Sequence, residues 1–268
     1  MSTDGSRGSL SIVGTGMSLA SHLTSQGLAE LQHADQVFYC LTSGVEDEWI
    51  TMINPAAASL MDCYGDDVPR ELTYARIVER ILAAVREGKR VCVAYYGHPG
   101  VFAWAPHEAV RRARREGYQA VMQPGISAAD CLFADLGIDP ADRGCQMFEA
   151  TDFVRRQPQY DSATPLILWQ VGLMGQSSGA SNVSSAAWHL QQLTDALRSR
   201  YGRHHAIALY EAAHFPNEPH KVDWRELDQL PSALVTIPVT LYIPPVPIDA
   251  ADDHAASQLA SSSSAPRS

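Results

Sequence analysis

The stretch that decides the fold is Arg90–Trp104, "RVCVAYYGHPGVFAW". Its first half is an apolar run typical of a buried strand, and the run ends at Gly97-His98-Pro99-Gly100, a strong turn signal. Bulky apolar residues follow this turn at once, where a surface connector would be polar. Because ligands collect at the carboxyl ends of strands in open α/β sheets, we expect the turn to line a binding site.

Strands and helices alternate on both sides of this stretch, which predicts an α/β fold. We expect strands at Leu10–Val13 and Gln36–Leu41, and a helix from Thr73 whose apolar residues recur at three- and four-residue spacing. We place a domain boundary near Gln123–Gly125, which gives an N-terminal α/β domain over residues 1–124.

A second α/β domain is expected over residues 125–247. A helix should begin after Ser127 as its N-cap, and a helix over Ala186–Arg200 should turn Trp188 inward. Strands are expected within "PLILWQVGLMG", "AIALYEAA" and "VTIPVTLYIPP", which cover Pro165–Gly175, Ala206–Ala213 and Val235–Pro245. The Ala-, Ser- and Asp-rich tail over residues 248–268 is expected to be disordered.

Composition excludes several classes of function. The 268 residues are 46% hydrophobic and carry a net charge of -10, which disfavours nucleic acid as a partner. The one basic run, Arg111–Gly117, is interpreted as the end of a helix.

No apolar run approaches the roughly 20 residues that span a bilayer, and no signal peptide or metal-binding spacing is found. The five cysteines include no C-x-x-C pair, so we expect a cytoplasmic protein with reduced thiols, no membrane association and no metal.

Two other glycine-containing turns follow expected strands. Gly14-Thr15-Gly16 lacks the full G-x-G-x-x-G pattern and is alone a weak signal for a phosphate site. "PGISAADCLFADLG", Pro124–Gly137, places small residues and a hydroxyl after a strand. Together with the Gly97 turn, it suits one modest ligand that has both polar and apolar parts.

The order of these motifs resembles a known family. "GTG", "YGHPGVF", "PGISAADCLFADLGIDP", "LILWQVG" and "VTLYIPP" follow one another as in the tetrapyrrole-methylase superfamily. Its precorrin and uroporphyrinogen methylases typically carry an acidic G-D-P where this chain has Gly97-His98-Pro99. The "YGHPGVF" form is similar to the borosin, omphalotin-type, peptide backbone N-methyltransferases, over about Gly8–Pro245. The resemblance implies a two-domain tetrapyrrole-methylase-like fold with a cofactor cleft between the domains.

The same resemblance implies S-adenosylmethionine as cofactor and names the residues expected to contact it. The family usually has serine where Val239 stands, so a side-chain hydrogen bond there should be lost, although a backbone contact could survive. The expected contacts are Tyr96, His98, Val101, Phe102, Ser127, Ala128, Gln170, Ala213, Val239 and Thr240.

The resemblance also implies a reactive set of Tyr64, Arg70 and Tyr74, with Tyr96 positioned near the methyl group. A peptide N–H is a poor nucleophile because its lone pair is delocalised into the carbonyl. Its methylation needs a base for the proton and a cation for the imidate oxygen. A tyrosine can act as the base if a cation such as Arg70 favours its phenolate, but Tyr64 and Tyr74 both remain candidates.

The substrate is expected to be a ribosomal precursor peptide, methylated in trans. In the fungal fused enzymes the peptide follows the methyltransferase, whereas here the tail after "YIPP" lacks a Val/Ile/Leu-rich segment. The resemblance also implies a homodimer, in which the polar loop Gln176–Ser185 is either a mobile interface segment or a plain surface loop. Two alternatives stay open: a methyltransferase for a tetrapyrrole-like small molecule, and an inactive protein that binds the cofactor or a peptide.

Overall fold

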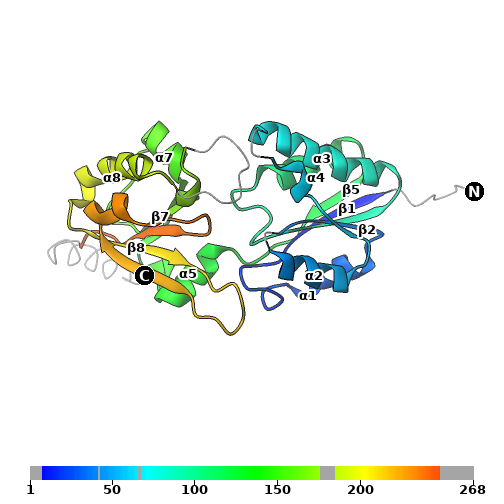
Figure 1. Cartoon of the computed structure of the whole chain (residues 1–268), viewed down its shortest axis with the longest axis horizontal. Helices are drawn as coiled ribbons and strands as arrows, with labels where there is room; N and C mark the ends of the chain where they lie inside the picture. The colour runs from blue at the N-terminus through cyan, green and yellow to red at the C-terminus, as the bar shows by residue number, and fades with distance from the viewer. Residues whose placement is uncertain (1–7, 42, 66–67, 176–184, 248–268) are drawn as a thin grey trace, which may run out of the picture.

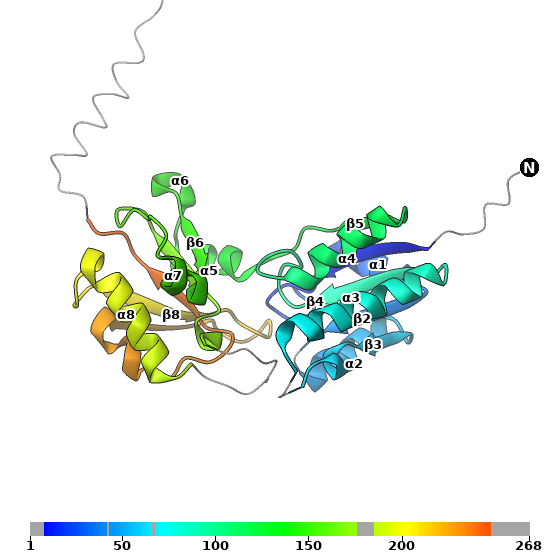
Figure 2. The same cartoon turned by 90° about the horizontal axis from the view of Figure 1, so that it is seen from above.

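Two α/β units lie side by side in the protein, each built around a five-stranded sheet (Figures 1 and 2). The structure is a computed structural model, and it describes residues 8–41, 43–65, 68–175 and 185–247. The sheets span residues 9–122 and 146–243, so the chain passes from one unit to the other through residues 123–127. The expected α/β fold of two units is confirmed. The tail and nearly all of the Gln176–Ser185 loop lie outside the described residues.

The first sheet is entirely parallel, in the order β3-β2-β4-β1-β5. Its strands are nearly continuous apolar runs because helices cover both faces. Helices α3 and α4 pack on one face, and α1 and α2 on the other (Figure 1). The elements are β1 (Ser9–Gly14), α1 (Ser25–His33), β2 (Gln36–Cys40), α2 (Gly44–Ile53), β3 (Ala57–Ser59), α3 (Arg70–Arg86), β4 (Arg90–Tyr95), α4 (Trp104–Arg115) and β5 (Gln119–Met122).

The second sheet is mixed, in the order β6-β7-β10-β8-β9, and only the β6–β7 pair is parallel. Helices α7 and α8 pack on one face, and α5 packs on the other. The elements are α5 (Ala128–Leu136), α6 (Pro140–Arg143), β6 (Gln146–Glu149), α7 (Ala150–Arg156), β7 (Leu166–Trp169), α8 (Ala187–Tyr201), β8 (Ala206–Glu211), β9 (Lys221–Glu226) and β10 (Thr240–Ile243), with short 3-10 turns at Met61–Cys63, Val171–Leu173 and Leu227–Ser232.

Several expected boundaries were wrong for local reasons. Strand β7 ends at Trp169 because Gln170 has a φ of 57°, which no strand residue adopts. Strand β2 ends at Cys40, one residue early. Only Thr240–Ile243 of the last apolar run pairs in the sheet, since Val239 donates its N–H to the carbonyl of Thr236 in a turn.

Two further expectations about helices were wrong. Helix α3 begins at Arg70, not at Thr73, because Pro69 is its N-cap and the loop ends there. Trp188 is 60% exposed, since α8 buries Leu190, Leu193 and Leu197 and turns the indole away from that face. Ser127 is the N-cap of α5, as expected.

Within the described ranges, no helix is long and apolar enough to cross a membrane, and no cluster of three His, Cys, Asp or Glu could hold a metal ion. All five cysteines are free thiols. Burial raises the pKa of Cys40 to about 12 and that of Cys131 to about 11, in each case with smaller contributions from neighbouring ionisable groups. These thiols therefore stay protonated near neutral pH.

Candidate active site

The carboxyl ends of the first sheet face the second unit, and the Gly97 turn lies there (Figure 1). Gly97 has a φ of 70°, which suits glycine. Gly16 donates its N–H to the carbonyl of Gly97 at 3.2 Å and receives the reciprocal bond at 3.0 Å. A Cβ on Gly14 would lie 2.2 Å from the carbonyl oxygen of Gly97. The first glycine turn therefore packs against the second as a support.

His98 holds the shape of this turn from inside. The Gly100 N–H donates to Nδ1 of His98 at 2.9 Å, across two residues. His107, on the first turn of α4, has Nε2 2.9 Å from the Gly100 carbonyl. The turn is thus fixed by side chains on both sides, and the apolar Val101 and Phe102 project beyond it.

A cavity of about 510 Å³ lies between the two units at this turn. We call it the Tyr96 cavity. Its volume suits a small-molecule ligand or cofactor. Nine of the ten residues expected to contact the cofactor line it: Tyr96, His98, Val101, Phe102, Ser127, Ala128, Gln170, Val239 and Thr240.

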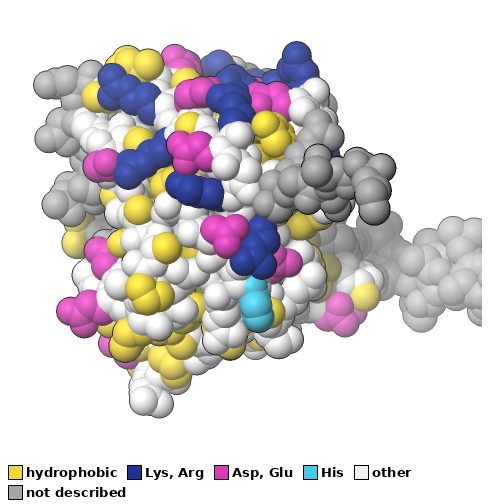
Figure 3. Space-filling model, turned by 90° about the vertical axis from the view of Figure 1, so that its right-hand side faces the viewer, with side chains coloured by type: hydrophobic (Ala, Val, Ile, Leu, Met, Phe, Trp, Pro, Cys, Tyr) yellow, Lys and Arg dark blue, Asp and Glu magenta, His cyan; other side chains and the backbone are white. Residues whose placement is uncertain are grey.

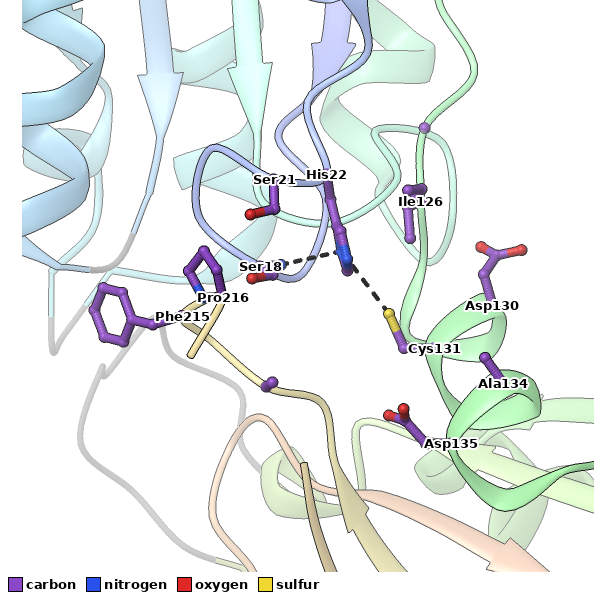
Figure 4. Close-up of a pocket in the computed structure, with 12 residues that line it drawn as sticks. Ser18, Ser21, His22, Ile126, Asp130, Cys131, Ala134, Asp135, Phe215 and Pro216 are labelled. Carbon is purple, nitrogen blue, oxygen red and sulfur yellow. Dashed lines mark hydrogen bonds between the residues drawn. The ribbon is translucent and has the colours of Figure 1, made fainter. Parts of the chain in front are cut away.

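The tenth, Ala213, does not line this cavity. Its neighbours Ala212 and His214 do, and Ala213 lines a separate cavity of about 520 Å³ instead (Figure 4). The cause is alternation, since successive side chains of an extended chain point to opposite sides. The expected cofactor contact at Ala213 stays a prediction.

The second cavity contains His22 and Cys131, which we use to name it the His22 cavity. The Ser18 N–H donates to Nδ1 of His22 at 3.2 Å, and the thiol of Cys131 lies 4.0 Å from the same nitrogen (Figure 4). Because Nδ1 already accepts the Ser18 bond and the thiol is protonated, this pair is not an activated nucleophile.

The lining of the Tyr96 cavity is aromatic and acidic. Phe102 and Trp169 pack with ring centroids 5.3 Å apart, and Trp169 Nε1 is buried without a hydrogen-bond partner. Glu211 is the one carboxylate among the described lining residues, and no Lys or Arg is among them. Its Oε1 accepts from Lys221, 2.8 Å away on the exposed edge strand. A cavity of this composition favours a ligand that carries positive charge beside an aromatic group.

Tyr96 joins the two units within the cavity. Burial raises the pKa of its phenol, and the nearby carboxylates of Glu46 and Glu211 add to this effect. Its ring lies 6.0 Å from that of His214, whose Nε2 is 3.9 Å from Oε1 of the buried Glu46. Tyr96 is therefore a neutral hydrogen-bonding group at neutral pH.

A groove of about 770 Å³ adjoins the cavity on the side of α3, α4 and α7. We call it the aromatic groove. Tyr74 stacks on Trp104 along it, with centroids 6.1 Å apart and planes inclined by 23°. Its wall residues are Tyr74, Gly100, Phe102, Ala103, Trp104, His107, Met147, Phe148, Glu149, Asp152, Phe153, Arg156, Pro158 and Gln170.

Phe102 and Gln170 separate the cavity from the groove, because both residues line both spaces. Both also adopt a left-handed backbone, with φ of 50° and 57°. A non-glycine residue in this region is strained by about 1 kcal/mol or more, and such strain gathers at functional sites. Phe102 and Gln170, which we call the threshold, therefore form the boundary between the Tyr96 cavity and the aromatic groove.

Arg70 and Tyr74 share a face of α3, since Arg70 is its first residue and Tyr74 lies one turn later. Tyr64 precedes the helix and packs against the core of the first unit. Burial raises the pKa of Tyr64 well above its usual value, and nearby Cys40 and Tyr74 add to the rise, whereas Arg70 lowers it by a smaller amount. The structure thus brings Tyr64 within electrostatic reach of Arg70 and Tyr74 but keeps it neutral. Among these three, Tyr74 alone lines the aromatic groove.

Several cavity residues were not anticipated. They are Met17, Trp169, Leu173, Glu211, Ala212, His214, Ile237 and Pro238. Trp169 and Glu211 carried a usable signal, since each ends an apolar run and ligands meet strand ends. The loop residues had no signal of their own, because packing between distant segments brings them to the cavity.

Residues 9–223 match the tetrapyrrole (corrin/porphyrin) methylases, so the chain belongs to this family. Solved structures agree at the level of the fold. A cobalt precorrin-4 methyltransferase superposes with a TM-score of 0.63 at 17% identity, covering 91% of this chain and 98% of that one. A uroporphyrin-III C-methyltransferase from Thermus thermophilus gives 0.62 at 20% identity, with 91% and 99% covered.

Among curated proteins, the chain is similar to fungal methyltransferases whose names also denote a peptide precursor. It is 39% identical over 248 residues to the methyltransferase/ribosomally synthesized cyclic peptide gymnopeptides precursor of Gymnopus fusipes. It is 37% identical over 252 residues to the corresponding omphalotin A precursor of Omphalotus olearius. Each alignment covers 91% of this chain and 59% of the relative, so the chain spans about three fifths of their length.

Proposed function

We propose that this protein is a methyltransferase that uses S-adenosylmethionine to methylate backbone amide nitrogens of a ribosomal peptide. The observation that carries the proposal is the pair of connected spaces. The Tyr96 cavity gathers nine expected cofactor contacts, and the aromatic groove that holds Tyr74 meets it at Phe102 and Gln170. The names of the fungal relatives, which couple a methyltransferase with a cyclic peptide precursor, support a peptide substrate.

The residues of the Tyr96 cavity fit this cofactor. When bound, S-adenosylmethionine supplies a methyl group on a cationic sulfur. Glu211 and the absence of Lys or Arg from the described lining favour the cation, and Phe102 and Trp169 offer faces to an adenine ring. The N–H of Val239 is already donated to Thr236, so any backbone contact there would use the carbonyl.

The amide is activated by groups of the first unit. We assign Tyr74 as the base, since it faces the groove through which a peptide would approach. Acting as a base, Tyr74 would take the amide proton one helical turn from the Arg70 guanidinium, and the amide nitrogen would then accept the methyl group that the cofactor supplies. Tyr64, held neutral, is suited to donate a hydrogen bond to the imidate oxygen, and Tyr96 positions the methyl group.

The test is intact-mass and fragmentation analysis of the peptide encoded beside the gene, co-expressed with the protein or with Arg70→Ala. The proposal expects mass gains in whole methyl units on backbone nitrogens, reduced by roughly a hundredfold or more in the variant. Calorimetry with S-adenosylmethionine and each protein controls for cofactor binding. Binding without methylation of any peptide would instead favour a small-molecule substrate or an inactive binding protein.

The same experiment tests two finer proposals. A separate peptide that gains methyl groups supports methylation in trans, whereas modification confined to a peptide in the same polypeptide contradicts it. Sedimentation equilibrium tests the proposed homodimer.

A further inference from the structure

We propose that a basic groove along α4 binds an acidic segment of the substrate peptide, a few residues away from the amide that is methylated. The inference rests on the proposed peptide substrate. The groove, which we call the arginine groove, has a volume of about 500 Å³. It is lined by His107, Val110, Arg111, Arg114, Arg115 and Met122.

The charge of this groove is only partly balanced by the protein. Glu108 accepts from Arg111 at 2.5 Å and from Arg112 at 2.6 Å, so one carboxylate is shared by two guanidinium groups. Arg114 donates its Nε–H to the carbonyl of Ala120, which leaves its charge in place. No acidic side chain is among the described residues that line the groove. The arginine groove is therefore a positively charged surface on a chain whose net charge is -10.

Other arginines of the same unit are paired with carboxylates on the surface. Arg86 lies 2.6 Å from Glu116, and Arg90 lies 2.8 Å from Asp35. The end of the molecule in Figure 3 accordingly shows basic and acidic side chains beside one another. In the arginine groove only Arg111 shares a carboxylate in this way, and among the described residues no ion pair is found for Arg114 or Arg115, which indicates that their charge serves an anionic ligand.

The arginine groove continues the aromatic groove. His107 lines both, and its ring is held by the Gly100 carbonyl. Trp104, His107, Arg111 and Arg114 follow at spacings of three, four and three residues, so they form one stripe on α4. The Tyr96 cavity, the aromatic groove and the arginine groove are therefore connected in this order, and we call the connected path the track.

The length of the track sets the spacing within the ligand. From Trp104 to Arg115 the helix rises about 16 Å, at 1.5 Å per residue. An extended peptide advances about 3.4 Å per residue, so about five residues cover this distance. An apolar residue at Trp104 would therefore place the acidic segment roughly five positions away.

A peptide suits the groove better than a nucleic acid does. Val110 and Met122 give it an apolar floor, and it opens into a groove lined with aromatic side chains. The overall negative charge of the protein opposes the approach of a polyanion, whereas a short run of Asp or Glu needs only local charge. The chemistry that fits is a short acidic stretch beside apolar residues.

The test uses synthetic fluorescein-labelled peptides with a Val- and Ala-containing core. One peptide carries four consecutive Glu residues five positions after the core, one carries them five positions before it, and one has Gln in their place. We expect one acidic peptide to bind roughly tenfold more tightly than the Gln peptide at low salt, and the advantage to shrink at high salt.

Arg111→Gln with Arg115→Gln should remove most of this advantage, while the matched variant Arg143→Gln with Arg198→Gln on the second unit keeps it. Equal affinities of all three peptides, or an advantage that survives loss of Arg111 and Arg115, would overturn the proposal. Tighter binding of a single-stranded oligonucleotide than of either acidic peptide would also overturn it.

A charge-reversal variant distinguishes the loss of the groove's positive charge from misfolding of the protein. Arg111→Glu with Arg115→Glu leaves only Arg114 among the groove's arginines and should favour a peptide with four Lys residues over the Glu peptide, whereas a misfolded protein would prefer neither. Failure of the proposed function is distinguishable, because methylation of the Gln peptide that depends on Arg70 tests it independently of the arginine groove.

Discussion

The two units contribute different things to one site. The first unit carries the groups that we assign to the reaction, with Arg70 and Tyr74 at the start of α3 and Tyr96 after β4. The second unit closes the Tyr96 cavity with strand ends and turns around Trp169, Glu211 and residues 237–240. The groups proposed for the reaction therefore come from the unit with the parallel sheet, whereas the unit with the mixed sheet supplies much of the cavity wall.

The largest expected effect separates the two tyrosines of the first unit. Tyr74→Phe should lower kcat by roughly a hundredfold, because Tyr74 faces the groove and we assign it as the base. Tyr64→Phe should cost less, since the buried Tyr64 stays neutral and donates one hydrogen bond. Single-turnover methylation of a synthetic peptide measures both.

The pH profile sharpens this comparison. Since burial raises the pKa of Tyr64, its loss should leave the shape of the rate profile between about pH 6 and pH 9 unchanged. If Tyr64→Phe slows the reaction as much as Tyr74→Phe does, or alters the profile, the assignment of the base must be exchanged.

A second prediction concerns the rigidity of the first unit. Gly14→Ala should lower the free energy of unfolding by roughly 2–3 kcal/mol, because the new Cβ would lie 2.2 Å from the Gly97 carbonyl and 2.8 Å from Pro99 Cδ. Gly44→Ala is the matched control, since a Cβ there meets nothing within 4 Å. Urea unfolding curves compare the two variants. Equal stabilities would show that the two glycine turns can move apart at little cost.

The smallest effect concerns backbone strain in the second unit. Gln170→Gly and Gln157→Gly both remove a side chain from a left-handed residue, with φ of 57° and 46°. Each should raise stability by up to about 1 kcal/mol. Only Gln170→Gly should weaken binding of S-adenosylmethionine, because Gln157 ends α7 and lines neither the cavity nor the groove. Calorimetry that finds the same loss in both variants would contradict a role for Gln170.

The same contrast between the units explains what could be read from the sequence. Strands β1, β2 and β4 were predicted because helices bury both faces and leave apolar runs. Strand β9, "KVDWRE", was missed because it is an exposed edge whose residues are mostly polar. The short β6 was missed as well, since four residues show little periodicity.

In the candidate site, too, some residues could be predicted from the sequence and others could not. The Gly97 turn was predicted because its unusual residues are contiguous in the sequence. His214 was not, because it reaches the cavity only when the two units meet, and Glu211 was missed although it ends the apolar run of β8. Ala213 lies in the same segment, where one step along an extended chain changes the cavity that a side chain faces.

The hydrogen bond that holds His98 allows another type of residue at position 98. The fold of the turn comes from backbone bonds between Gly16 and Gly97, and the side chain at 98 needs only to offer an acceptor to the Gly100 N–H. An aspartate, as in the G-D-P form typical of precorrin methylases, can offer the same acceptor. The turn can therefore hold either side chain at position 98 with the same backbone hydrogen bonds. Within such a family, the charge presented to the ligand could diverge by one substitution while the architecture stays the same.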